Sequence, residues 1–167
     1  MKYAGRFYFV SNFGRALQAH KDNGEMHASK DVDSIGVEER WNVYVWDDGT
    51  ISLQNLSNNA FLCAEPGGKA ICNRANPDTW EKWKLYGANN KVALCSSQNT
   101  WLTAQAPGDD TQFGGEVIAN RTVCDVWEKF SMIPVDGIPS PGSWWDNVKG
   151  AIEVAGQVVR IVVAVAG

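Results

Sequence analysis

Two short loops of this 167-residue chain carry the residue types that hold sugars in proteins without catalysis. Trp80 and Trp127 each stand three residues before another aromatic residue. An indole ring at the mouth of a loop can stack against the apolar face of a sugar ring. The same loops contain amide, guanidinium and carboxylate groups that can exchange hydrogen bonds with hydroxyls. These polar candidates are Asn73, Arg74, Asp78, Asn120, Arg121 and Asp125.

The tryptophans, asparagines and arginines also have a purely structural interpretation. The two Trp side chains could be rim residues that lid the end of a barrel. The two asparagines could cap turns, and the two arginines could pair with Glu81 and Glu128. The sequence leaves both interpretations open. If the sites are functional, they belong to the second and third copies of an internal repeat, because the first copy has Glu38 where the others have Trp80 and Trp127.

Catalytic chemistry has no comparable pattern in the sequence. Gly-x-Ser-x-Gly, His-Glu-x-x-His, P-loop and dinucleotide-binding motifs are all missing. The scattered Asp and Glu residues single out no pair suited to glycoside hydrolysis. The four Cys residues are dispersed, and His20 and His27 are the two His residues, which argues against zinc. We therefore expect a non-catalytic protein that needs no metal and no cofactor.

Two cysteines flank a glycine turn. Cys63 and Cys72 are nearly equidistant from residues 66–68, which predicts that they face each other on the outer side of a hairpin, with Leu62 and Ile71 directed inward. A disulfide is conceivable in that arrangement, and two free thiols are the alternative. The N-terminus shows no secretory signal, which favours free thiols in a reducing compartment. We expect the protein to be cytoplasmic, or exported by a route without a classical signal peptide.

The elements that position these loops occur three times. The clearest copies are 80–83 and 127–130, which read Trp-Glu-Lys followed by Trp or Phe, and 38–41 is a fainter first copy. An aliphatic residue or Met follows two positions later in each copy, which is the period of a strand. Further strand-like segments and turn residues align upstream in all three copies. The repeat therefore predicts three units of about four short strands each.

Three such units are too few for a propeller, which needs at least four blades. They predict an all-β fold, the β-trefoil, over residues 1–137, in which a closed barrel is capped by hairpins. Strand alternation directs Trp41, Trp83 and Phe130 into the barrel and the neighbouring Lys82 outward.

The repeat resembles the fascin-like and ricin-B-like β-trefoils. A short strand, Phe-Leu-x-Ala, a glycine turn, Asn-Arg and Trp-Glu-Lys-Phe carry the resemblance, which covers about residues 5–137. The Gln-x-Trp motif of ricin-B lectins is missing, because Gln98 and Trp101 have the wrong spacing. Members of the fascin-like branch bundle actin, and related trefoils bind glycans. The resemblance therefore implies a binding module and leaves the ligand open.

The composition changes after residue 137. Two prolines at 138–143 predict an extended linker. Over 144–167, apolar residues recur at spacings of three and four, which predicts a C-terminal amphipathic helix. Residues 158–165 are nearly all β-branched, so a terminal strand is the alternative. The segment could dock on the barrel, mediate self-association or contact a membrane.

Charge and composition limit the classes of partner. The net charge of −4 argues against nucleic acid as a partner. The sequence contains no run of 18 apolar residues, which is the pattern that predicts a membrane span. Our leading hypothesis is a lectin that binds a glycan or glycoprotein. The alternatives are a fascin-like module that binds actin or another protein, and a membrane-active, pore-forming protein that uses residues 144–167.

Overall fold

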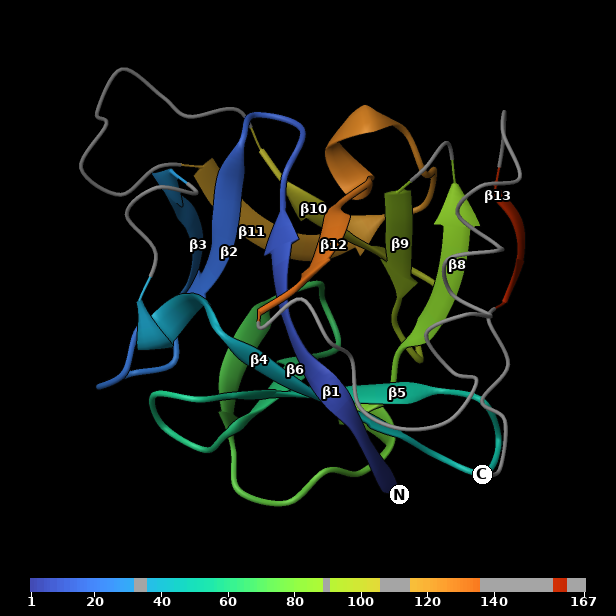
Figure 1. Ribbon diagram of the computed structural model, residues 1–167. Coiled ribbons are helices and arrows are strands. Elements are labelled where there is room, and N and C mark those ends of the chain that lie inside the picture. The colour runs from blue at the N-terminus through green and yellow to red at the C-terminus, as the bar shows by residue number, and fades with distance from the viewer. Residues whose placement is uncertain (32–35, 89–90, 106–114, 136–157, 162–167) are drawn as a thin grey trace.

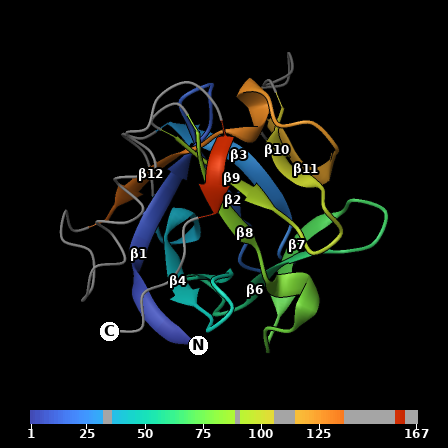
Figure 2. The same ribbon diagram turned by 90° about the vertical axis from the view of Figure 1, so that its right-hand side faces the viewer.

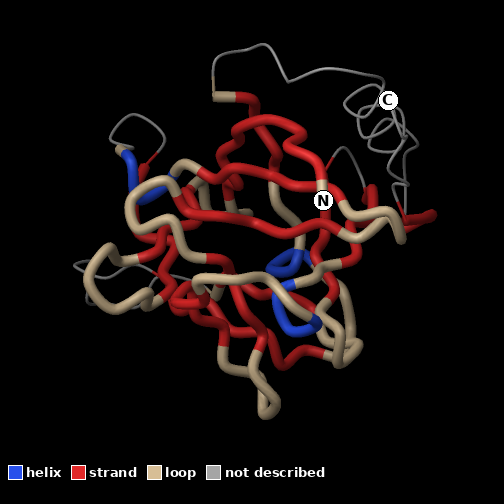
Figure 3. Tube along the Cα trace, turned by 90° about the horizontal axis from the view of Figure 1, so that it is seen from below, coloured by secondary structure: helices blue, strands red, loops and turns tan. Residues whose placement is uncertain are grey.

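The computed structural model describes residues 1–31, 36–88, 91–105, 115–135 and 158–161, and strands dominate these ranges (Figures 1 and 3). The first unit contains β1 (Lys2–Val10), β2 (Arg15–Ala19), β3 (Met26–Asp31) and β4 (Trp41–Val45). The second contains β5 (Ile51–Asn55), β6 (Phe61–Ala64), β7 (Ala70–Arg74) and β8 (Lys84–Ala88). The third contains β9 (Lys91–Cys95), β10 (Trp101–Ala104), β11 (Gly115–Arg121) and β12 (Ser131–Pro134). A 3₁₀ turn precedes the fourth strand of each unit: η2 (Val37–Glu39), η3 (Thr79–Glu81) and η4 (Val126–Glu128).

The first and fourth strands of the units form a closed barrel. β1 pairs with β4 and β12, β4 pairs with β5, and β8 pairs with β9. The two remaining junctions are single residue pairs. Ile51 and Trp83 exchange backbone hydrogen bonds of 2.8 Å in both directions, and Val92 and Phe130 do the same. Closure satisfies the backbone groups that an open sheet would leave at its edges.

The second and third strands of each unit form a hairpin, and the three hairpins meet in a cap. β3 pairs with β11, while single bridges join the second hairpin to its neighbours on either side. The backbones approach so closely there that Gly24 and Gly68 are required. The carbonyl of Gly24 accepts from the amide of Cys72 at 2.8 Å. A side chain at Gly24, where φ is +73°, would lie 2.3 Å from the Cys72 carbonyl oxygen.

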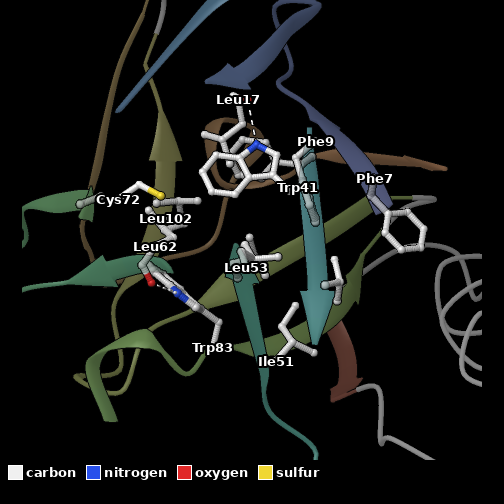
Figure 4. Packing of buried hydrophobic residues seen from close by; sticks show 14 of the residues in the cluster. Phe7, Phe9, Leu17, Trp41, Ile51, Leu53, Leu62, Cys72, Trp83 and Leu102 are labelled. Atoms are coloured by element: carbon white, nitrogen blue, oxygen red, sulfur yellow. Dashed lines mark hydrogen bonds between the residues drawn. The ribbon is translucent and has the colours of Figure 1, made fainter. Parts of the chain in front are cut away.

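Large aromatic residues fill the space between the barrel and the cap (Figure 4). Trp41, Trp83 and Phe130 are 0% exposed, which confirms that the fourth residue of each quartet is a core residue. The indole N–H of Trp41 donates to the carbonyl of Leu17 at 2.9 Å, and that of Trp83 donates to Leu62 at 3.1 Å (Figure 4). Each indole therefore ties the fourth strand of its unit to the second strand. The all-β arrangement expected from the repeat is confirmed.

A thirteenth strand, β13 (Val158–Ile161), pairs antiparallel with β8 (Figure 2). The amphipathic pattern predicts a helix here, whereas these four residues form the strand that their β-branched side chains favour. The expected linker at 138–143 and the rest of the C-terminal segment lie outside the described residues. Among the residues that are described, no helix is long and apolar enough to cross a membrane.

The register of the β6–β7 hairpin corrects the expected placement of its two cysteines. Ala64 pairs with Ala70, so Cys63 lies opposite Ile71 and Cys72 lies opposite Leu62. The predicted pairing was one residue away from this register, and a slip of one residue moves a side chain to the other face of a strand. Cys72 therefore belongs to the core cluster, and its thiol donates to the carbonyl of Ala60 at 3.2 Å. All four cysteines of the chain are free, so the disulfide alternative is wrong.

Burial makes these thiols weak acids. It raises the pKa of both Cys63 and Cys72 to about 12, and that of Cys124 to about 11, from an ordinary value of 9.0. The thiolate is the reactive form. We therefore expect the thiols of Cys63, Cys72 and Cys124 to react with an aromatic disulfide reagent at about pH 8 far more slowly than free cysteine does. In urea, where the chain is unfolded, all four cysteine thiols should react without added reductant. Two reactive thiols in urea instead of four would contradict this assignment.

The same raised pKa values make the stability of the fold depend on pH. The folded state favours the neutral thiols, so their contribution to the free energy of unfolding is complete below the ordinary value of 9.0 and is lost as the pH rises toward about 12.

Candidate functional site

A buried glutamate shapes the loop before the fourth strand of the second unit. Asp78 is the N-cap of η3, and its carboxylate accepts from the amide of Thr79 at 2.9 Å. The amide of Asp78 in turn donates to Oε1 of Glu81 at 2.8 Å, and Glu81 is 3% exposed. This reciprocal pair is a capping box, which fixes the turn. Trp80 lies between its two members and is directed outward, with 40% of its surface exposed.

The third unit repeats this geometry closely. The carboxylate of Asp125 accepts from the amide of Val126 at 2.9 Å, and the amide of Asp125 donates to Glu128 at 2.8 Å. Glu128 is 5% exposed and Trp127 is 36% exposed. The sequence therefore presents an indole on a fixed turn twice.

The first unit keeps the turn and lacks the indole. The amide of Gly36 donates to Glu39 at 3.1 Å, and Glu38 takes the place of the tryptophan. The carboxylate of Glu38 accepts from the amide of Lys21 at 2.7 Å and from the side chain of Gln18 at 3.2 Å. Glu38 is therefore engaged within its own unit.

Each exposed indole lines a groove. The second-unit groove encloses about 440 Å³ and is lined by Arg74, Asp78, Thr79, Trp80 and Glu81. The third-unit groove encloses about 450 Å³ and is lined by Arg121, Thr122, Val123, Asp125, Val126, Trp127 and Glu128. The structure thus brings an indole, an arginine and an aspartate of the predicted set together in each groove.

The two predicted asparagines lie outside both linings. Asn73 is exposed, and its side-chain oxygen accepts from the guanidinium of Arg74. Asn120 is exposed as well and packs against Gly68, where the hairpins of the second and third units meet. The structural alternative was that these asparagines cap turns. Among the described residues, neither Asn73 nor Asn120 makes a hydrogen bond that caps a turn.

The arginine of the second-unit groove has a different partner from the one considered. Nη2 of Arg74 lies 2.8 Å from Oε2 of Glu65, at the end of β6, whereas Glu81 is used by the capping box. The hydrogen bond to Glu65 raises the pKa of Arg74 above its ordinary value. The side chain of Arg121, at the equivalent place in the third unit, makes no hydrogen bond or ion pair with any described residue.

Phe13 supports the indole of the third-unit groove from outside the lining, and the sequence did not reveal this contact. It lies in the turn between β1 and β2, and its ring meets that of Trp127 edge-on, with 5.9 Å between centroids and 60° between planes. Such a contact adds about 0.5–1.5 kcal/mol and holds the indole in place. Phe13 is more than 100 positions from Trp127 and belongs to another unit, so no local pattern links the two.

No protein-family model and no curated protein sequence matches the chain, whereas solved structures match it in fold. The designed three-fold symmetric protein ThreeFoil matches with a TM-score of 0.65 at 13% identity, over 78% of this chain and 99% of its own. The chain is a β-trefoil. A Polyporus squamosus lectin bound to the epitope Neu5Acα2-6Galβ1-4GlcNAc matches with a TM-score of 0.64 at 13% sequence identity, over 79% of this chain and 49% of the lectin. A mosquitocidal holotoxin matches with a TM-score of 0.65 at 12% sequence identity, over 77% of this chain and 16% of the toxin.

The structural similarity establishes the trefoil fold, and at such low sequence identity it establishes no activity. The chain corresponds to about half of the lectin chain and a small part of the holotoxin chain. The resemblance to ricin-B-like trefoils is confirmed at the level of the fold, and the fascin-like alternative stays a prediction.

The capping glutamate should contribute measurably to stability. Replacing Glu128 with Ala leaves the amide of Asp125 without its acceptor, so we expect the free energy of unfolding in urea to fall by about 1–3 kcal/mol. Glu128→Gln retains an acceptor oxygen and should cost less. The exposed Glu116→Ala on β11 is the matched control, and it should change stability by less than about 0.5 kcal/mol. Equal effects of Glu128→Ala and Glu116→Ala would contradict the role of the capping box.

Proposed function

We propose that this trefoil is a non-catalytic glycan-binding module that holds sugars in the second-unit and third-unit grooves. One observation carries the proposal: two of the three units present an exposed indole on a turn fixed by a capping box, each beside an arginine and an aspartate. The first unit has the same turn without the indole, so the fold itself does not require an exposed tryptophan there.

The chemistry of the two grooves suits a sugar. A pyranose has an apolar C–H face, which can stack on an indole, and hydroxyls at its edge, which need both donors and acceptors. The guanidinium supplies donors, and the aspartate supplies an acceptor. The capping boxes fix the backbone that carries both indoles, so little backbone conformational entropy is lost when a ligand binds. The lectin of the same fold, which is bound to a sialylated epitope, supports this choice of ligand class.

Two grooves on one chain would also allow bridging. Shallow sites hold single sugars weakly, and simultaneous use of two sites raises the apparent affinity for a branched or surface-bound glycan. We therefore expect weak binding of free sugars and strong binding of multivalent glycoproteins.

A protein-interaction role is the second candidate, and one observation favours it. Val123 and Val126 line the third-unit groove and are 70% and 49% exposed. Exposed apolar groups that gather around an aromatic residue often mark a protein interface. Co-sedimentation with filamentous actin tests the fascin-like version, and background levels in the pellet would reject it. The membrane-active alternative depends on a segment that is largely outside the described residues, and it stays a prediction.

Truncation of the indoles tests the glycan proposal. Trp127→Ala and Trp80→Ala should each lower the affinity of the affected groove about tenfold, because the stacking surface is lost. The double variant should lose agglutination of glycoprotein-coated beads altogether. Binding is measured by calorimetry with the best sugars from a glycan array, and circular dichroism confirms that each variant is folded.

Tyr3→Ala is the matched control. Tyr3 is 43% exposed, and its ring meets that of Tyr44 edge-on with 5.6 Å between centroids. It therefore resembles Trp127 in exposure and support, and it lies outside both grooves. We expect this variant to bind like the parent. Absence of any glycan binding at millimolar sugar, or equal losses in Tyr3→Ala and Trp127→Ala, would reject the proposal.

A further inference from the structure

The two grooves differ in the state of their arginine. In the second-unit groove, the guanidinium of Arg74 pairs with Glu65 at 2.8 Å and also donates to Asn73. Glu65 is itself held at the end of β6, where its amide donates to the carbonyl of Lys69 at 2.8 Å. The positive charge of this groove is therefore already matched by a carboxylate of the same hairpin.

Arg121 occupies the equivalent position in the third unit. It lies opposite Trp101 in the β10–β11 hairpin, as Arg74 lies opposite Phe61 in the β6–β7 hairpin. The residue equivalent to Glu65 is Gln105, which follows β10 as Glu65 follows β6 and carries no charge. Arg121 is exposed, lines the groove and makes no ion pair with any described residue. Within the described part of the chain, its positive charge therefore has no carboxylate partner of the kind that Glu65 gives Arg74.

The other charges do not cancel this difference. Asp125 and Glu128 also line the third-unit groove, and their counterparts Asp78 and Glu81 line the second. All four accept hydrogen bonds from backbone amides in the same capping geometry. The carboxylates are thus common to both grooves, and the third-unit groove differs in having an arginine that forms no ion pair with a described residue.

A lysine beside each groove follows the same trend. In the second unit, Lys82 lies 3.8 Å from Asp48 and 4.2 Å from the centre of the Trp46 ring. Its counterpart Lys129 makes no ion pair with a described residue. The sequence has Asn89-Asn90 between β8 and β9, where the preceding unit has Asp47-Asp48 between β4 and β5. Among the residues that the structure describes, neither Arg121 nor Lys129 has an acidic partner such as Glu65 gives Arg74 and Asp48 gives Lys82.

The lining of the third-unit groove strengthens this charge. Val123 and Val126 stand where the second unit has Asn76 and Thr79. Apolar walls exclude water and strengthen the attraction between an arginine and an anion. The structure thus combines in one groove an indole, apolar walls and a guanidinium that forms no ion pair with the described residues.

We infer that the third-unit groove selects anionic sugars, with Arg121 binding a carboxylate or sulfate group while Trp127 stacks on the ring, and that the second-unit groove takes neutral sugars. This inference rests on the proposed function, because it names the ligand class of one of the two proposed sites. An arginine binds either anion through paired N–H donors, so the shared chemistry is an oxyanion on a sugar ring.

Exchange of the partner residues between the units tests the inference. The probes are lactose, sialyllactose and sulfated lactose, measured by calorimetry. In a Trp80→Ala background, which leaves the third-unit groove intact, we expect the anionic sugars to bind about tenfold more tightly than lactose. Gln105→Glu gives Arg121 the partner that Arg74 has and should abolish the preference. The preference should also weaken between about 20 mM and about 500 mM salt.

The second-unit groove provides the reverse experiment. In a Trp127→Ala background we expect no preference for the anionic sugars, and Glu65→Gln should create one by releasing Arg74. A preference for only one of the two anionic sugars would identify the source of the oxyanion and support the inference.

Two outcomes would overturn the inference, and they are distinguishable. Equal binding of all three sugars in the Trp80→Ala background, unchanged by Gln105→Glu, would reject the anionic selectivity and leave the glycan proposal standing. Absence of binding of all three sugars to the parent protein, together with an empty glycan array, would reject the proposed function and this inference with it.

Discussion

A buried glutamate carboxylate closes the turn before the fourth strand in every unit, and the geometry of both grooves depends on it. Glu39, Glu81 and Glu128 are 2%, 3% and 5% exposed, and each accepts from the amide three positions earlier. With the turn closed, the residue before the glutamate is exposed in the second and third units and half-buried in the first. The aromatic residue two positions after the glutamate points into the barrel. One quartet of residues therefore serves the core and the surface together, and a substitution at its first position changes the surface without disturbing the barrel.

The three units use this freedom differently. The first has a glutamate that is engaged within its own unit, and the second has an indole beside an arginine paired with Glu65. The third has an indole, apolar walls and an arginine that forms no ion pair with the described part of the chain. The shared turn makes the comparison informative, because the same backbone carries three different sets of side chains. The differences therefore bear on the ligand, while the common features account for the fold.

The regular spacing of the repeat made most of the fold predictable from the sequence. Side-chain contacts between residues distant in the sequence could not be predicted. The repeat located the strands and the core positions of Trp41, Trp83 and Phe130, because a buried aromatic at a fixed place in a strand leaves a periodic signal. The pairing of Arg74 with Glu65 and the contact of Phe13 with Trp127 join residues of different strands or units, and no local pattern records them. The Cys72 placement failed for a related reason: a hairpin register off by one residue reverses the face of a strand.

The indole N–H signals in a two-dimensional NMR spectrum test the central claim most directly. The chain has eight tryptophans, and single Trp→Phe variants assign the signals of those exposed in the grooves and those buried in the core. On titration with a glycan selected from an array, the account predicts that the signals of Trp80 and Trp127 shift in a saturable way while those of Trp41 and Trp83 stay in place. Saturable shifts confined to other tryptophans, or unchanged signals for Trp80 and Trp127 with a ligand known to bind, would contradict it.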